Sequence, residues 1–163
     1  MSFDISVITP VRNEEETIPL FIAEISTVLK ELDLKYEIIF ITDQNDDNTW
    51  QVLKNEHKNN KNIQLIKLTR SSGQHVAIIA GLQHCAGDCA LLIDGDLEMP
   101  PSEIPKLYKE FEIGIDIVYG TNKNKNQSFT GDIFSRLFNY IMNKLSDEDY
   151  NFNTDMFRII SKR

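Results

Sequence analysis

Short apolar runs alternate along the chain with stretches in which apolar residues recur at helical spacing. The apolar runs predict strands at residues 5–9, 36–41, 63–68, 89–93 and 115–119, with a further strand in the closing FRIISKR. The first stretch between them predicts a helix whose apolar face comprises Ile18, Phe21, Ile22, Ile25, Leu29 and Leu32. Pro10 is expected to close the first strand, and Asn13 to cap this helix.

Strand–helix alternation of this kind predicts the α/β class, with a mostly parallel sheet and helices on both faces. Such sheets bind ligands at the carboxyl ends of their strands, so polar residues just after each strand are the first candidates for a site. A later stripe at helical spacing comprises Phe134, Leu137, Phe138, Ile141, Met142 and Leu145. It serves the core or a dimer contact, while a membrane-interface role is disfavoured by a polar face with only Arg136 and Lys144 as cations.

Length and composition indicate one ordinary globular domain spanning residues 1–163. The net charge of −8 argues against broad nucleic-acid binding, which requires basic surface. Cys85 and Cys89 form neither a disulfide framework nor a metal-binding spacing. Without a leader sequence or a bilayer-spanning apolar run, the chain is expected to be cytoplasmic, where it could still contact a membrane surface as a monomer or homo-oligomer.

The segment LLIDGDLEMPP holds the clearest candidate chemistry, because two carboxylates follow a buried strand directly. If the chain stays extended, Asp94 and Asp96 point the same way, and Gly95 leaves room for a ligand beside the backbone. Two adjacent carboxylates favour a hard divalent cation, Mg²⁺ or Mn²⁺, with Glu98 as a third oxygen ligand. The alternative is that Asp-Gly-Asp is only a surface turn.

Three further groups lie at the same predicted edge of the sheet. Asn13 and Glu14 in TPVRNEEE could hold the polar edge of a base or ribose, or could simply cap a helix. Asp43, after the second strand, could accept a hydrogen bond from a ring N–H of uracil or guanine. Arg70, after the third strand, could meet a diphosphate or be an ordinary surface arginine.

Five segments, taken in their order and spacing, resemble one known family. TPVRNEEETI, YEIIFITDQNDDNT, LTRSSGQHVAIIAGL, LLIDGDLEMPP and IVYG are similar to the N-terminal part of family 2 glycosyltransferases with the Rossmann-like GT-A nucleotide-sugar-binding fold. The similarity is strongest to the polyprenyl-phosphate sugar transferases, such as dolichol-phosphate mannose synthase and the bactoprenol glucosyltransferases. It covers essentially the whole chain, although relatives continue beyond the point at which this sequence ends.

The resemblance implies a role for each matching residue. Asp94-Gly95-Asp96 would be the family's DxD motif, holding a metal that bridges the diphosphate of a UDP- or GDP-sugar, with Glu98 where relatives have a metal-binding glutamine. The implied nucleotide-binding positions are Pro10, Val11, Asn13, Glu14 and Asp43, followed by Arg70 and Gly73 of an R-x-x-G segment near the donor. The resemblance also implies a catalytic role for Asp96, and for Asp155 as a base.

This chain also departs from the family pattern at several positions. Thr42 replaces an acid that usually precedes Asp43, and Gln44-Asn45 replace a Gly-Ser turn. In TDMFRI, direct alignment puts Met156 in the slot of the catalytic aspartate, one residue after Asp155. Other departures are Arg12 in place of tyrosine, Met99 in place of a polar residue, and Thr121-Asn122-Lys123 where relatives offer an arginine.

The leading hypothesis is a metal-dependent, inverting glycosyltransferase whose acceptor could be a polyprenyl phosphate at the cytoplasmic face of a membrane. A second hypothesis is a domain that binds a nucleotide sugar without transferring it. A third, a nucleotidyltransferase, is disfavoured because no glycine-rich, lysine-containing triphosphate loop is found near the N-terminus.

Overall fold

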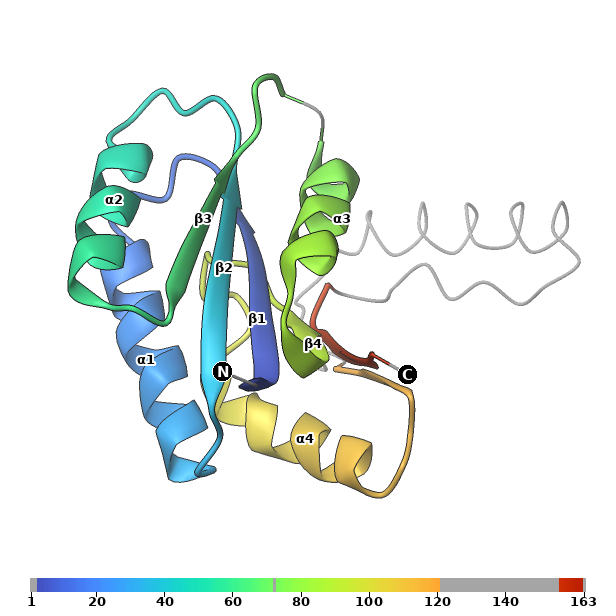
Figure 1. Ribbon diagram of the computed structural model, residues 1–163. Coiled ribbons are helices and arrows are strands. Elements are labelled where there is room, and N and C mark those ends of the chain that lie inside the picture. Colours follow the sequence, from blue (N-terminus) through green and yellow to red (C-terminus); the bar gives the residue numbers. More distant parts are fainter. Residues whose placement is uncertain (1–2, 72, 121–155, 163) are drawn as a thin grey trace, which may run out of the picture. The chain divides into compact units, whose positions relative to one another are not determined.

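The computed structural model describes residues 3–71, 73–120 and 156–162. Contacts within the chain define two compact units. The first consists of Met1–Gly120 together with Met156–Arg163, and the second consists of Thr121–Asp155. The first unit is the α/β body that carries the labelled elements in Figure 1. The stripe of apolar residues at 134–145 lies outside the described residues, so its predicted roles stay predictions.

One six-stranded sheet forms the centre of this unit, in the order β3-β2-β1-β4-β6-β5. Its strands are β1 Phe3–Val11, β2 Tyr36–Thr42, β3 Ile63–Lys67, β4 Gly87–Leu92, β5 Ile117–Tyr119 and β6 Arg158–Ser161. The β1–β2, β2–β3 and β1–β4 pairs are parallel, whereas β6 pairs antiparallel with both β4 and β5. The predicted mostly parallel sheet is therefore confirmed, with β6 as an antiparallel insertion near one edge.

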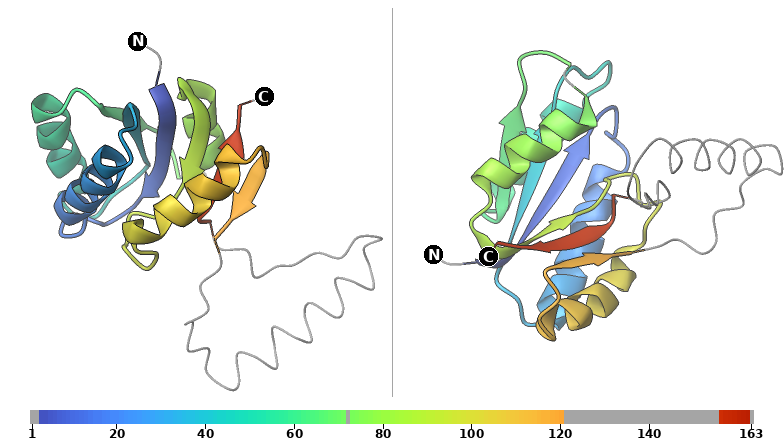
Figure 2. Two further views of the ribbon diagram at one scale, coloured as in Figure 1. Left: turned by 90° about the horizontal axis from the view of Figure 1, so that it is seen from below. Right: turned by 90° about the vertical axis from the view of Figure 1, so that its right-hand side faces the viewer.

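Helices cover both faces of the sheet, as predicted. The helical elements are α1 Ile18–Glu31, α2 Thr49–Asn59, α3 Gln74–His84, the short 3₁₀ turn η1 Pro101–Glu103, and α4 Ile104–Glu112. Helices α1, α2 and α4 pack with one core and α3 with a second core on the opposite face (Figures 1 and 2). Among the described residues, no helix combines the length and apolar character that crossing a bilayer requires.

Burial explains why the sequence forms these elements. All seven residues of β2 are buried, as expected for a parallel strand with neighbours on both sides and helices on both faces. Five apolar side chains of α1 are also buried, at the spacing that the sequence predicted: Ile18, Phe21, Ile22, Ile25 and Leu29. Each buried side chain of this size contributes about 1.5–3 kcal/mol to folding. The core thus holds the strands in a fixed register.

Two predictions at the start of the chain are wrong. Pro10 does not close the first strand but lies inside β1, in register with Ile41 of β2. The Ile8 carbonyl accepts a hydrogen bond from the Ile93 amide, so alternate residues from Ile8 onward face β4. Pro10 faces that side beyond the end of β4, where no ladder bond needs its missing N–H. Similarly, the N-cap of α1 is Thr17 and not Asn13, which adopts a left-handed φ of 57°.

The strand order identifies where a ligand would bind. The chain proceeds from β1 outward to β2 and β3, and then returns to place β4 on the other side of β1. The direction in which strands are added to the sheet therefore reverses between β1 and β4. In open α/β sheets, ligands bind outside the carboxyl ends of the strands near such a reversal.

Candidate functional site

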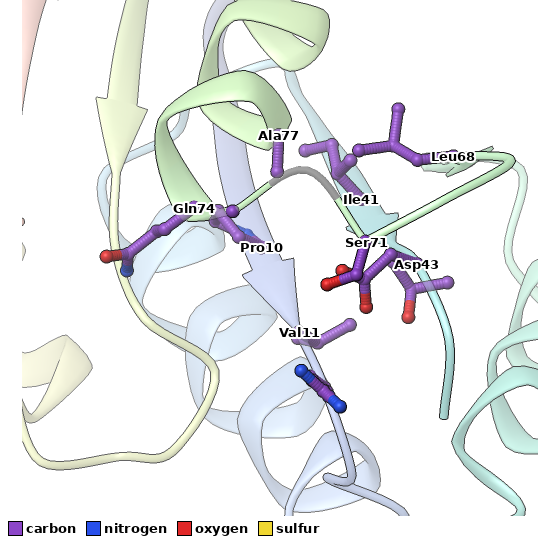
Figure 3. Close-up of a pocket in the computed structure, with 11 residues that line it drawn as sticks. Pro10, Val11, Ile41, Asp43, Leu68, Ser71, Gln74 and Ala77 are labelled. Carbon is purple, nitrogen blue, oxygen red and sulfur yellow. The ribbon is translucent and has the colours of Figure 1, made fainter. Parts of the chain in front are cut away.

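A cavity of about 270 Å³ opens at the carboxyl ends of β1 and β2. Its lining residues come from these strand ends, the segment after β3 and the first turns of α3: Pro10, Val11, Arg12, Ile41, Thr42, Asp43, Leu68, Ser71, Gly73, Gln74 and Ala77. Figure 3 shows Asp43 and Ser71 on one side of this hollow, with Val11 between them and the start of α3. The structure thus brings together four predicted binding residues, namely Pro10, Val11, Asp43 and Gly73.

Asp43 is the polar residue of this cavity whose hydrogen bonding is incomplete. Its Oδ1 atom is buried and has no hydrogen-bond partner within the described residues. A buried acceptor without a partner costs about 1–3 kcal/mol, so such atoms are rare unless a ligand supplies the donor. A carboxylate at this place is suited to a ligand that presents an N–H or O–H group.

Asn13 does not line the cavity but ties two loops together. Its side-chain oxygen accepts a hydrogen bond from the Asp46 amide at 2.8 Å, and its side-chain nitrogen donates to Asp46 Oδ2 at 3.4 Å. The Asn13 amide donates to Asn45 Oδ1 at 3.1 Å, and Asn45 in turn bonds the Thr42 hydroxyl. The Gln44-Asn45 departure therefore supplies a side chain that holds the loop after β2 against the loop after β1.

Glu14 belongs to the same pair of loops. Its amide donates to Thr49 Oγ1 at 2.7 Å, while its carboxylate accepts from Thr17 Oγ1. Neither Asn13 nor Glu14 lies among the residues that line this cavity, so their predicted contact with a base or ribose stays a prediction. Their positions instead fix the strand ends that do line the cavity.

Asp47 completes this contact between the loops. Burial would raise the pKa of its carboxyl, but hydrogen bonds from the Thr49 hydroxyl and from the Thr49 and Glu15 amides outweigh burial and hold the pKa below its usual 3.8. The lowered pKa means that Asp47 stabilises the fold above its unfolded-state pKa. This contribution is lost as the pH falls through the folded-state value.

Asp94 is connected to the cavity by a hydrogen bond from Gln74, which is one of the lining residues. The Gln74 side-chain amide donates to Asp94 Oδ1 at 2.9 Å and lies 3.2 Å from the sulfur of Met156. Gln74 extends to the side of α3 opposite Asp43 (Figure 3). The N-terminus of α3, the end of β4 and the start of β6 therefore meet at one amide group.

Beyond Asp94 the chain is a turn and not the extended segment that was predicted. The Glu98 amide donates to Asp96 Oδ1 at 2.9 Å, and Leu97 adopts a left-handed φ of 61°. Among the described residues, no three His, Cys, Asp or Glu side chains are grouped so as to hold a metal ion. Asp94, Asp96 and Glu98 thus do not form a ready-made three-carboxylate site, because the turn redirects the chain after Asp94.

The structure gives Gly95 a role that the sequence did not indicate. A Cβ at this position would lie 2.7 Å from Val11 Cγ1 and 3.2 Å from Thr9 Cγ2. The missing side chain therefore makes room for β1, and the predicted room for a ligand stays a prediction. The turn after β4 rests directly on Val11, which lines the cavity.

The remaining predicted residues have separate outcomes. Gly73 lines the cavity with φ 81°, a conformation that side chains rarely adopt, which accounts for glycine before α3. Arg70 is exposed and does not line the cavity, so its contact with a diphosphate stays a prediction. Asp155 lies outside the described residues.

Sequence reasoning missed the role of Gln74 and treated Arg12 only as a departure from the family. Arg12 lines the cavity and brings a positive charge to it. The signal for Gln74 was its place directly after Gly73, where a first-turn side chain faces the strand ends. Its contact with Met156, 82 residues later, could not be read from local pattern.

Comparison with known proteins identifies the family. The model of glycosyl transferase family 2 matches residues 6–163. The chain belongs to this family. Family membership agrees with the position of the cavity and of Asp94 at the carboxyl ends of the strands.

A curated relative extends this comparison. The chain is 36% identical over 136 residues to undecaprenyl-phosphate 4-deoxy-4-formamido-L-arabinose transferase of Pseudomonas fluorescens (strain SBW25). The match covers 83% of this chain and 40% of that relative, so the family 2 chain spans about two fifths of the relative's length.

Solved structures of glycosyltransferases share the fold. Glucosyl-3-phosphoglycerate synthase from Mycobacterium tuberculosis, in complex with Mn²⁺, UDP and phosphoglyceric acid, matches with a TM-score of 0.72 and 20% identity over 98% of this chain and 56% of its own. A mannosyltransferase from Pyrobaculum calidifontis, in complex with GDP-Man and Mn²⁺, matches with a TM-score of 0.65 and 18% identity, covering 77% of this chain and 37% of its own. The family 2 chain therefore has the Rossmann-like GT-A fold.

Proposed function

We propose that this chain is the donor-binding part of a metal-dependent, inverting glycosyltransferase that takes its sugar from a UDP- or GDP-sugar. The observation that carries this proposal is the Oδ1 atom of Asp43, which has no partner among the described residues and lies at a cavity whose lining residue Gln74 bonds Asp94. One end of the site accepts a hydrogen bond, and the other offers carboxylates. A nucleoside diphosphate has a ring N–H at one end and a phosphate chain that requires a cation at the other.

The base would occupy the cavity between Val11, Asp43 and Leu68. Uracil and guanine both present a ring N–H that the Asp43 carboxylate can accept. The apolar side chains of Val11 and Leu68 suit the face of a planar base. Arg12 supplies a cation at the same cavity and could offset part of the ligand's negative charge.

Mg²⁺ or Mn²⁺ is the proposed cofactor, held by Asp94 and Asp96. Carboxylate oxygens are the ligands that these hard cations prefer, and two carboxylates leave coordination positions open for phosphate oxygens. An ion held there would supply Lewis-acid stabilisation of the negative charge on the departing nucleoside diphosphate. Mn²⁺ is present in solved neighbours of the same fold, which supports this choice.

The transfer itself requires an acceptor oxygen on the face of the anomeric carbon opposite the diphosphate. That oxygen forms the new bond as the bond to the diphosphate oxygen breaks, so the configuration inverts. A hydroxyl acceptor would need a base, whereas a phosphate acceptor is already ionised. The name of the undecaprenyl-phosphate relative supports a polyprenyl phosphate as acceptor, for which the protein would work at a membrane surface.

Titration calorimetry with UDP, GDP and CDP, with and without Mn²⁺, tests this proposal. We expect one of UDP and GDP to bind in the low micromolar to millimolar range, more tightly with Mn²⁺, and CDP to bind weakly. The substitution Asp96→Asn should abolish the gain from Mn²⁺. No binding of any nucleotide at millimolar concentration would reject the proposal.

A second candidate function is binding of the nucleotide sugar without transfer. Met156 favours it, because the slot that the family resemblance assigns to a base holds an uncharged thioether in contact with Gln74. Release of UDP or GDP from the sugar nucleotide in the presence of a short prenyl phosphate separates the two candidates. Metal-dependent binding without such release would favour the second.

A further inference from the structure

Arg158 begins β6 and lies close to the proposed donor site. It is in register with Leu92, at the end of β4 and two residues before Asp94, and with Tyr119, at the end of β5. Because β6 is antiparallel, its first residue lies at the carboxyl ends of its neighbours. Met156, two residues before Arg158, is the residue in contact with Gln74, which bonds Asp94.

The side chain of Arg158 projects on the same face of the sheet as α3. Alternate residues of a strand share a face, and the flanking Met156 and Ile160 both pack with the α3-side core. Phe157 and Ile159, by contrast, belong to the core on the opposite face. The guanidinium of Arg158 is therefore on the side of the sheet on which Gln74 and the cavity lie.

Arg158 has no anionic partner among the described residues. Its Nε atom is buried without a hydrogen bond to any described residue, and the ion pair found among those residues is between Lys106 and Glu103. Its remaining contact is with the ring of Tyr119, whose centroid lies 5.7 Å from the guanidinium carbon. Stacking of this kind orients the guanidinium but leaves its N–H donors available.

An exposed apolar track extends from Arg158 along the edge of the sheet. Tyr119 and Ile117 of β5 are each 46% exposed and pair with Arg158 and Ile160 of β6, respectively. Directly paired residues lie on the same face, so both project on the α3 side. Val118, between them, packs with the opposite core, which also contains Leu107 of α4. Figure 2 shows β5 and β6 at this edge of the sheet.

We propose that Arg158 and the track formed by Tyr119, Ile117 and Ile160 bind the acceptor, with Arg158 on its phosphate and the track against its isoprenoid chain. This inference rests on the proposed glycosyltransferase function and identifies an acceptor subsite for it. A planar guanidinium can donate two parallel hydrogen bonds to one phosphate. A neighbouring exposed apolar surface adds affinity for a ligand that carries a hydrocarbon chain on that phosphate.

Calorimetric titration of geranyl phosphate into the 163-residue chain tests this subsite. We expect Arg158→Gln to weaken binding by about tenfold to a hundredfold, because a charged hydrogen-bonded pair is lost. The affinity of Arg158→Lys should fall between those of the unsubstituted chain and Arg158→Gln, since lysine keeps the charge but cannot donate two parallel hydrogen bonds. Lys162→Gln is the matched control: it removes the same charge from an exposed residue just beyond the other end of β6, and it should leave the affinity within about twofold of the unsubstituted chain.

Ile117→Ser tests the apolar track separately from the phosphate contact. Ile117 is exposed, so the protein should fold normally, and binding of geranyl phosphate should weaken by about threefold to tenfold. Inorganic phosphate should bind more weakly than geranyl phosphate, and its affinity should be unchanged by Ile117→Ser. The affinity for geraniol, which lacks the phosphate, should be unchanged by Arg158→Gln.

Three results would overturn the subsite: no binding of geranyl phosphate at millimolar concentration, equal losses in Arg158→Gln and Lys162→Gln, or an Arg158→Gln protein that keeps full affinity. Should Arg158→Gln fail to fold, Arg158→Lys together with Ile117→Ser decides the same question. Nucleotide affinity in Mn²⁺ is measured separately and should be unchanged in all these variants. Binding of UDP or GDP without binding of geranyl phosphate would thus reject the acceptor subsite alone. Binding of geranyl phosphate without binding of either nucleotide would reject the proposed donor function.

Discussion

The two ends of the central sheet carry carboxyl groups with opposite surroundings. At the amino ends, Glu37 of β2 is fully buried and accepts hydrogen bonds from the Ser6 hydroxyl and the Ala86 amide, both at 2.6 Å, and from the Gln64 side chain. At the carboxyl end of the same strand, Asp43 Oδ1 is buried with no partner among the described residues. The carboxyl group at the start of β2 therefore has its hydrogen-bond partners within the protein, whereas the one just after its end does not among the described residues.

This contrast distinguishes a structural acid from a binding acid. Glu37 joins four strands, since Ser6 also accepts from the Gly87 amide at 2.8 Å. Its partners come from the protein, so it specifies how the strands align. Asp43 lacks such a partner at a cavity, and it stabilises the fold less than a satisfied carboxyl would. That cost is reasonable only if a ligand supplies the missing donor.

Removing Glu37 should give the largest effect on stability. Glu37→Ala leaves the buried Ser6 hydroxyl and two part-buried donors without their acceptor and opens a cavity, so we expect a loss of about 3–5 kcal/mol in the free energy of unfolding. Urea unfolding followed by circular dichroism measures it. Glu110→Ala, on the exposed side of α4, is the matched control and should change stability by less than about 0.5 kcal/mol. A small effect of Glu37→Ala would contradict the structural role of this end.

Substitution of Asp43 should affect binding and spare stability. Asp43→Asn should weaken UDP or GDP binding by about 1.5–3 kcal/mol, because the amide cannot offer a charged acceptor to the ring N–H. The free energy of unfolding should stay the same or rise, since the amide removes a negative charge whose buried Oδ1 has no partner among the described residues. Asp88→Asn removes the same charge from an exposed residue at the amino end of β4 and should change neither quantity. Equal losses of affinity in both variants would indicate a general charge effect.

Gly95→Ala should produce a moderate loss at the carboxyl end. The added Cβ would press on Val11, so we expect a decrease in stability of about 1–3 kcal/mol together with weaker nucleotide binding. The double variant Gly95→Ala/Val11→Ala removes the clash and should recover part of the stability. If the single variant had unaltered stability and affinity, the turn after β4 would not rest on β1 as described.

The smallest effect concerns the thiols near the amino end. Burial is the main cause that raises the pKa of Cys89 to about 12, and the negative charges of Asp88 and Asp4 add to it. Cys85, by contrast, is only half-buried. At pH 8 an aromatic disulfide reagent should therefore react with one thiol in the native protein and with two in guanidinium chloride. The raised pKa also predicts that the contribution of Cys89 to stability is full below pH 9 and is lost as the pH rises toward 12. Rapid reaction of both native thiols would show that this end is open.

The elements could be predicted from the sequence because their signals are local. The spacing of Ile18, Phe21 and Ile25 and the continuous apolar run of β2 depend on residues within one segment. The same holds for the location of the site, since the strand order of such folds places Asp43 and Asp94 at one edge.

The predictions that failed required knowledge of neighbours in space. Pro10 fits inside β1 only because β4 ends earlier. The Asn13 side chain does not cap α1 because it accepts a hydrogen bond from the Asp46 amide of another loop. The turn after Asp94 depends on Leu97, a residue type that rarely adopts a positive φ, so the sequence favoured an extended segment. Arg158 gains its significance only when β6 inserts between β4 and β5.

The insertion of β6 has a consequence for how this protein could be re-engineered. The Gly120 amide bonds the Phe157 carbonyl at 2.8 Å, so the points where the chain leaves and re-enters the sheet are joined to each other. A foreign loop grafted between these two residues would start and finish at fixed, adjacent anchors. Exchange of residues 121–155 among homologues is therefore expected to leave the register of β5 and β6 unchanged.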